Sequence, residues 1–168
     1  MTAIFGYKHL FFLVMNRIRI AKDKADLVKA LTESEGKTGP FKTYADVMVF
    51  AASLAIKKKQ RVPLTEISPR EPGPINIEVF WSRGYESIIK LIAIADTRDT
   101  KILCQTNEEI EENRIKIFEE YANGGLEILR DELRGAVNYS ERLLLVLISE
   151  RYQKPQPETE FDLTKFLG

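Results

Sequence analysis

The sequence predicts a mainly helical protein in which a basic strand-helix-helix module precedes a small helical bundle. Two observations predict this fold class. Apolar residues recur at the spacing of amphipathic helices through most of the chain, and one short segment near the N-terminus alternates at the period of a strand. Glycine and proline gather in the few segments that separate these elements.

The strand is Asn16–Ile20, where alternation places Arg17 and Arg19 on one face and Ile18 and Ile20 on the other. A basic strand followed by two helices is the order of elements in ribbon-helix-helix proteins. In those proteins two copies pair their strands, and the polar face of the ribbon enters the DNA major groove. We therefore expect a ribbon-helix-helix-like module that forms a homodimer, because an isolated short strand needs a partner.

The two helices of this module are bounded by recognisable signals. Ala21–Ser34 carries an apolar stripe and ends before Gly39-Pro40. The second helix begins after Thr43, with Asp46 three residues later in the manner of a capping box. It is apolar nearly all round and closes on the cations of Lys57–Arg61, which suit the negative end of a helix.

A segment rich in proline, Ser68–Pro74, cannot form regular structure and is the expected boundary of the module. It separates the basic strand-helix-helix module, residues 16–67, from an acidic helical region, residues 75–153, that packs on it. Residues 154–168 form a tail. Residues 1–15 are an extension, because Met15 directly before the strand is the start of translation that we expect.

The acidic region contains four or so predicted helices. Tyr85–Ala95 is strongly apolar and is predicted to be buried. Asn107–Tyr121 is acidic and amphipathic, and its carboxylates are interpreted as a solvated face. We expect Asn123-Gly124-Gly125 to break this helix before it resumes at Leu126–Arg134, because glycine tolerates the conformation that ends a helix. The last helix, Ser140–Tyr152, is hydrophobic enough to be predicted as central.

Charge is distributed unevenly along the chain. Residues 1–62 contain 12 Lys and Arg against 5 Asp and Glu, which gives +7, and residues 63–168 contain 13 against 20, which gives −7. Such asymmetry indicates nucleic-acid contact by the basic part. The alternative is chance clustering on two solvated surfaces.

Several classes of function are disfavoured by composition. Cys104 is the only cysteine and His9 the only histidine, so intrachain disulfides, cysteine metal sites and histidine-dependent catalysis are not expected. A single cysteine suits a reducing cytoplasm, which is the expected location. The apolar run Leu10–Met15 is too short to span a bilayer. We expect no enzyme, no cofactor, no metal and no membrane partner.

The candidate DNA-binding residues are Arg17, Arg19, Lys37, Lys42 and Thr43. Long cationic side chains on one face of a paired strand can reach base edges or phosphates. Thr43 opens a helix whose free amide groups suit a phosphate, and Lys37 and Lys42 flank it. The alternative is a basic surface on a helical protein whose edge strand is protected by charge.

Four stretches of this sequence together carry a resemblance to a known family: Arg17-Ile18-Arg19-Ile20, Thr38–Val47, Phe118–Leu129 and Glu132–Val137. The family that they resemble is called DNA phosphorothioation-associated (dnd system-associated) protein 4. The resemblance covers most of Arg17–Tyr152 and implies a role beside the bacterial machinery that replaces a non-bridging phosphate oxygen of DNA with sulfur, or beside the linked restriction system. It brings no catalytic residues.

The sequence thus predicts a non-enzymatic DNA-binding accessory protein of a phosphorothioation system, whose acidic helices recruit another component. Binding should weaken steeply with salt, and alanine at Arg17 and Arg19 should weaken it without unfolding the protein. Two alternatives stay open: a protein–protein adaptor that never touches DNA, and a transcriptional regulator of its own gene cluster.

Overall fold

The computed structural model describes residues 17–33, 39–104 and 107–152, so the predicted extension, the predicted tail and Lys37 lie outside it. Its elements confirm the mainly helical class. In chain order they are β1 (Arg17–Ile18), η1 (Lys22–Lys24), α2 (Ala25–Leu31), α3 (Tyr44–Lys58), β2 (Ile75–Asn76), α4 (Ile77–Ser82), α5 (Glu86–Thr97), η2 (Thr100–Leu103), α6 (Glu108–Glu132) and α7 (Tyr139–Tyr152).

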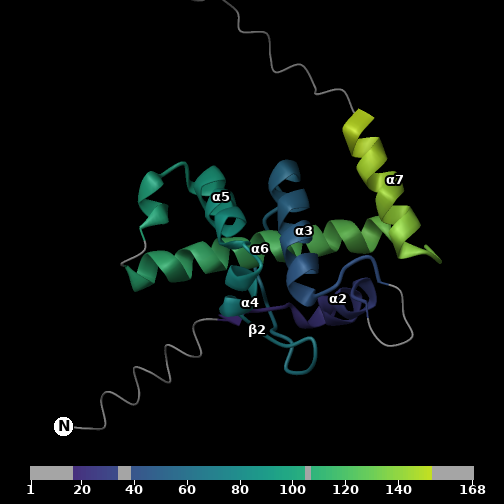
Figure 1. Ribbon diagram of the computed structural model, residues 1–168, viewed down its shortest axis with the longest axis horizontal. Helices are drawn as coiled ribbons and strands as arrows, with labels where there is room; N and C mark the ends of the chain where they lie inside the picture. The colour runs from purple at the N-terminus through teal and green to yellow at the C-terminus, as the bar shows by residue number, and fades with distance from the viewer. Residues whose placement is uncertain (1–16, 34–38, 105–106, 153–168) are drawn as a thin grey trace, which may run out of the picture.

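The long helix α6 lies across the middle of the molecule and organises the rest (Figure 1). β2, α2 and α4 lie on one side of α6, α5 lies on the other, and α3 crosses it. Residues of α6 from Ile117 to Leu126 are all buried, because neighbours cover the helix on every side. The principal core contact of the fold is therefore the one between α3 and α6.

The predicted helix break at Asn123-Gly124-Gly125 is wrong, since α6 is continuous through these residues. The glycines serve the crossing with α3 instead. A Cβ atom on Gly125 would lie 1.9 Å from the carbonyl oxygen of Ala51, and one on Gly124 would lie 2.1 Å from that of Gln60. Only a residue without a side chain permits this approach of two backbones.

The strand β1 pairs with β2 of the same chain, antiparallel, with Arg17 opposite Asn76 and Ile18 opposite Ile75. Its alternation is as predicted, because Ile18 is fully buried while Arg17 is exposed. The ribbon-helix-helix arrangement is not confirmed. The strand already has a partner, so the reason for expecting dimerisation through it no longer holds.

The capping box predicted at the start of the second helix is confirmed. The Thr43 side chain accepts a hydrogen bond from the backbone N–H of Asp46, and the Asp46 carboxylate accepts one from the backbone N–H of Thr43. The first predicted helix is shorter than expected, because α2 ends at Leu31 and Thr32 is extended. Glu33 and Phe41 then join by a backbone hydrogen bond, which brings the start of α3 beside α2.

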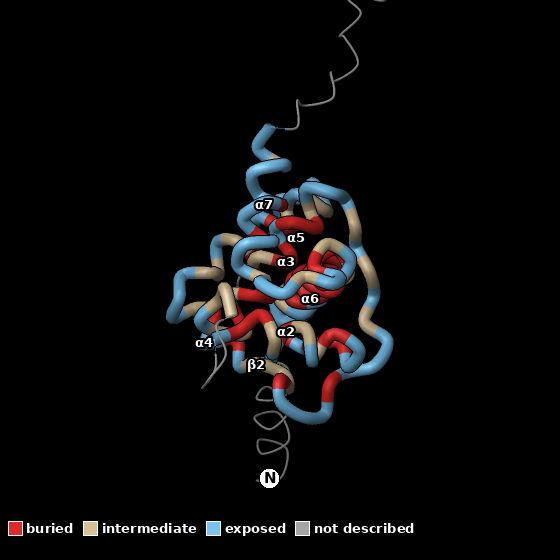
Figure 2. The backbone as a smooth tube through the Cα atoms, turned by 90° about the vertical axis from the view of Figure 1, so that its right-hand side faces the viewer, coloured by how far each residue is buried: buried red, intermediate tan, exposed pale blue. Residues whose placement is uncertain are grey.

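One cluster of buried apolar side chains includes residues from both sides of the predicted boundary, such as Ile18 and Phe118. The acidic region therefore packs directly on the basic module. Figure 2 shows this core along α3 and α6 and the exposed helix α7 standing apart from it. The prediction that Ser140–Tyr152 is central is wrong, because only Leu143 and Val146 of α7 are buried.

Candidate functional site

The predicted DNA-binding residues do not form one cluster in the structure. Arg17 is exposed on β1, and Lys42 is exposed immediately before α3. Neither side chain makes an ion pair or hydrogen bond with any other part of the chain that the structure describes. Arg19 and Thr43, by contrast, are held by carboxylates of the protein itself.

Arg19 is bound to Glu119 of α6. Its Nε lies 3.0 Å from each carboxylate oxygen and its Nη2 lies 2.6 Å from Oε2, while its backbone N–H donates to Oε1 at 2.6 Å. The Glu119 side chain is fully buried and that of Arg19 is 44% exposed. Burial raises the pKa of Glu119 against the opposing effect of Arg19, and the hydrogen bond to Glu119 raises the pKa of Arg19.

This arrangement saturates the Glu119 carboxylate with hydrogen bonds from one residue. A bidentate guanidinium–carboxylate pair of this kind fixes both groups in position. Arg19 therefore anchors the segment after β1 to the middle of α6, and its guanidinium is bound by a carboxylate of the protein itself.

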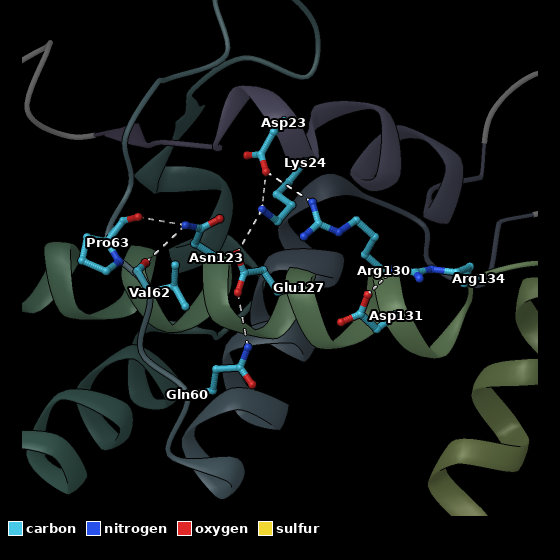
Figure 3. A network of polar contacts seen from close by, with 10 residues as sticks. All are labelled: Asp23, Lys24, Gln60, Val62, Pro63, Asn123, Glu127, Arg130, Asp131 and Arg134. Carbon is cyan, nitrogen blue, oxygen red and sulfur yellow. Dashed lines mark hydrogen bonds and ion pairs between the residues drawn. The ribbon is translucent and has the colours of Figure 1, made fainter.

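Lys24 is buried against the same helix (Figure 3). Its ammonium group contacts the Asp23 carboxylate and lies 3.5 Å from Oε1 of Glu127 on α6. The other oxygen of Glu127 accepts a hydrogen bond of 3.4 Å from Gln60, which follows α3. The Glu127 carboxylate of α6 therefore contacts both Lys24, which precedes α2, and Gln60, which follows α3.

Arg61 shows the same pattern on the opposite side of α6. Its Nε lies 2.6 Å from Oε2 of Glu120, and its Nη1 lies 2.6 Å from Oδ2 of Asp96 on α5. The Tyr121 hydroxyl donates to the other Asp96 oxygen at 2.7 Å. Burial and this hydrogen bond raise the pKa of Tyr121 to about 12. The segment after α3 is therefore tied to two helices at once.

The pairing of these cations explains the charge asymmetry of the sequence. Within the described residues, six of the 12 cations in the N-terminal part pair with carboxylates of the C-terminal part, so the two parts neutralise each other. The asymmetry is then weaker support for a nucleic-acid partner than it was in the sequence. The pairs are Arg19–Glu119, Lys22–Glu66, Lys24–Glu127, Lys57–Glu150, Lys58–Glu150 and Arg61–Glu120.

The start of α3, predicted to receive a phosphate, is occupied by the side chain of Asp46. Its Oδ2 lies 2.9 Å from the Thr43 nitrogen, Arg83 donates to both carboxylate oxygens at 2.9 and 3.0 Å, and Tyr85 donates at 2.6 Å. Burial alone would raise the pKa of Asp46, but the hydrogen bonds from Tyr85, Thr43 and Arg83 outweigh it and lower the pKa. A phosphate at Thr43 would face this negative charge.

A cavity of about 240 Å³ opens beside the Arg19–Glu119 pair. Its two carboxylates, Glu119 and Glu120, are each bound by an arginine of the protein, Arg19 and Arg61 respectively. In the parts of the chain that the structure describes, no group of three His, Cys, Asp or Glu side chains is placed to hold a metal ion. The lining residues are Arg19, Leu64, Thr65, Ile67, Lys116, Glu119 and Glu120.

The fold and its surfaces thus define a helical protein built around one long helix, with ion pairs that tie its basic and acidic parts together. A family model described as DNA sulphur modification system-associated protein 4 matches residues 17–166. The chain belongs to this family, as its resemblance predicted, and the family is associated with a DNA sulphur modification system. No curated protein and no solved structure matches the chain. None of the helices in the described ranges has the length and apolar character needed to cross a membrane.

Proposed function

We propose that this chain is a non-enzymatic accessory protein of a DNA sulphur modification system that contacts the DNA backbone. One observation carries the proposal: Arg17 and Lys42 are exposed and make no ion pair within the described residues. Six other cations of the N-terminal part, by contrast, form ion pairs with carboxylates of the C-terminal part. Unpaired cations are available to phosphates without breaking any contact of the fold.

Lys29 on α2 is exposed and unpaired in the same way. The elements that carry these three cations, β1, α2 and the segment leading into α3, lie on one side of α6 (Figure 1). Contacts to phosphates fix a protein on the duplex but carry no sequence information. The proposed binding is therefore independent of sequence, which favours an accessory protein over a transcriptional regulator.

The proposal leaves out two predicted contacts for stated physical reasons. Arg19 would have to abandon the buried Glu119 carboxylate, and Thr43 would have to admit a phosphate beside Asp46. With three cations per protomer, the salt dependence should be shallow rather than steep, because each phosphate contact contributes about 0.9 to the slope of log K against log salt.

Alanine at Arg17 and at Lys42 is expected to weaken binding to a 20-base-pair duplex, and each change should lower the salt slope by about 1. Fluorescence anisotropy at several salt concentrations measures both quantities. Lys101→Ala is the matched control, because Lys101 is also exposed but lies in η2, beside α5 on the other side of α6.

Equal affinity and equal slope for the wild type and for the Arg17→Ala, Lys42→Ala double variant would contradict the proposed contact. Absence of binding to any duplex at low salt would favour the adaptor, in which the protein contacts only other components of the system. A large preference for the promoter of its own gene cluster would favour the regulator.

The proposal also includes a protein partner from the same modification system. The first turns of α6 expose Glu108, Glu109 and Glu112, which suit a basic surface on such a component. These carboxylates make no ion pair within the described residues and so remain available to a partner.

A further inference from the structure

Helix α7 is attached to the body of the protein along one defined face. Leu143 and Val146 on that face are buried. One turn further on, Glu150 accepts from Lys57 at 2.6 Å and lies 3.1 Å from the ammonium of Lys58, both at the end of α3. These contacts fix which side of α7 faces inward and which side faces solvent.

The outward side of α7 is exposed, as Figure 2 shows, and large apolar side chains gather on it between Leu144 and Tyr152. A contiguous group of large exposed apolar side chains on one helix marks an interaction site, because isolated exposed leucines are common but a row of them is not. The group consists of Leu144 (57% exposed), Leu145 (53%), Leu147 (47%), Ile148 (42%) and Tyr152 (75%).

The centre of this face has the spacing of a helix-pairing seam. Glu141, Leu144, Ile148 and Arg151 follow one another at intervals of three, four and three residues, which is the repeat that keeps side chains facing a partner helix. The seam is apolar in the middle and carries opposite charges at its two ends. Neither Glu141 nor Arg151 makes an ion pair within the described residues.

We propose that α7 pairs with α7 of a second copy of this chain, antiparallel, about a two-fold axis at the level of Val146. In this register Leu144 faces Ile148 of the partner subunit, and Glu141 faces Arg151 of the partner subunit. The two-fold axis repeats both contacts, as an interface between identical subunits requires. A parallel pair would instead place Glu141 beside Glu141 of the partner subunit and Arg151 beside Arg151 of the partner subunit.

This charge pattern selects a second copy as the occupant of the face. One stretch of sequence supplies both members of each ion pair and both sides of the apolar contact, so no other protein has to provide a matching surface. The dimer is independent of the proposed DNA contact, which involves β1, α2 and the start of α3 rather than α7. It would place two DNA-contacting surfaces in one assembly and so increase avidity.

Sedimentation equilibrium on the full chain tests the proposal. The wild type is expected to sediment as a dimer at micromolar concentration. Glu141→Arg and Arg151→Glu should each weaken the association at least tenfold, because like charges then face each other across the seam. Combining the two substitutions should restore the association, since the charges are again opposite.

Both side chains are exposed, so circular dichroism of all these variants should be unchanged. Leu144→Asp supplies a second route to the monomer that does not depend on the charge pairs. A wild type that remains monomeric at 100 µM (roughly a hundred times the concentration expected to suffice) would overturn the proposal. A dimer that none of these substitutions weakens, or a double charge variant no better than the single ones, would also overturn it.

Discussion

Alanine at Gly125 is expected to lower the free energy of unfolding by about 3 kcal/mol or more, which is the upper range for overpacking a well-packed core. The added Cβ would lie 1.9 Å from the carbonyl oxygen and 2.8 Å from the Cα of Ala51, so the backbones of α3 and α6 would have to separate. At an exposed position in the middle of a helix the same change would stabilise by up to about 1 kcal/mol. The predicted sign is therefore opposite to that of helix propensity.

Urea unfolding followed by circular dichroism measures this effect. Gly73→Ala is the matched control, because the nearest atom to its added Cβ, the Arg70 carbonyl oxygen, lies 3.6 Å away at ordinary contact distance. Gly73→Ala should therefore leave the urea concentration at the midpoint of unfolding nearly unchanged. A Gly125→Ala variant as stable as the wild type would show that α3 and α6 do not cross as described.

Alanine at Arg19 is expected to destabilise the protein by about 3 kcal/mol, the lower range for breaking a buried ion pair, because it leaves the fully buried Glu119 carboxylate without its partner. Glu119→Gln should cost less. Arg19 is 44% exposed and can be hydrated, and the glutamine oxygen can still accept the hydrogen bond from the Arg19 backbone. The double variant should be more stable than Arg19→Ala alone, since no charge is then buried.

The pH dependence of Arg19→Ala gives a second readout. Burial already raises the pKa of Glu119 in the folded protein, and loss of Arg19 removes the group that opposes this shift. A carboxyl whose folded pKa is raised favours folding below its unfolded pKa, and this contribution is lost as pH rises through the folded pKa. The destabilisation by Arg19→Ala should therefore be larger at pH 8 than at pH 5 in urea unfolding. A pH-independent loss, or a larger loss for Glu119→Gln, would contradict the described pair.

The ion pair between Arg19 and Glu119 also corrects an expectation drawn from the sequence. Alanine at Arg19 was expected to weaken DNA binding without unfolding the protein, but Arg19 binds Glu119 and any loss of DNA binding would be confounded by loss of stability. Arg17→Ala has no such consequence, because Arg17 is exposed and makes no contact of this kind within the described residues.

The parts of the fold that the sequence predicted correctly depend on local chemistry. The alternation of Ile18 with Arg17 fixes which face of β1 is buried, and Thr43 with Asp46 fixes where α3 begins. Both are properties of residues a few positions apart. They hold whatever the rest of the chain does, so they can be derived without knowing which segments pack together.

The parts that the sequence did not predict depend on distant neighbours. Gly124-Gly125 suits either a helix end or a close crossing, and only the position of Ala51 decides between them. Glu119 and Glu120 were interpreted as solvated because charged residues in an amphipathic helix normally face water. Their burial follows from the arginines that reach them from segments 59 and 100 residues away in the sequence. Glu119 and Glu120 lie between the aromatic residues Phe118 and Tyr121. Charged residues are rare beside buried aromatic residues, and this was the signal in the sequence that pointed to their burial.

Helix α7 is the converse case, because the sequence predicted it to be buried and the structure shows it mostly exposed. Its apolar content predicted a central position, but the core is already filled by α3, α5 and α6, and only one face of α7 finds space against it. Composition indicates that a helix will be covered. It does not indicate whether the cover belongs to the same chain or to a second copy.

The most direct test of the proposed function is the salt dependence of DNA binding by the unaltered protein, measured by anisotropy on matched plain and phosphorothioated duplexes. Contact through Arg17, Lys29 and Lys42 predicts binding to the plain duplex at low salt, with a slope of log K against log salt of about −3 for one protomer. A phosphorothioate keeps its negative charge, so the slope should be similar on the modified duplex. Absence of binding to both duplexes at the lowest salt concentration would contradict the proposal.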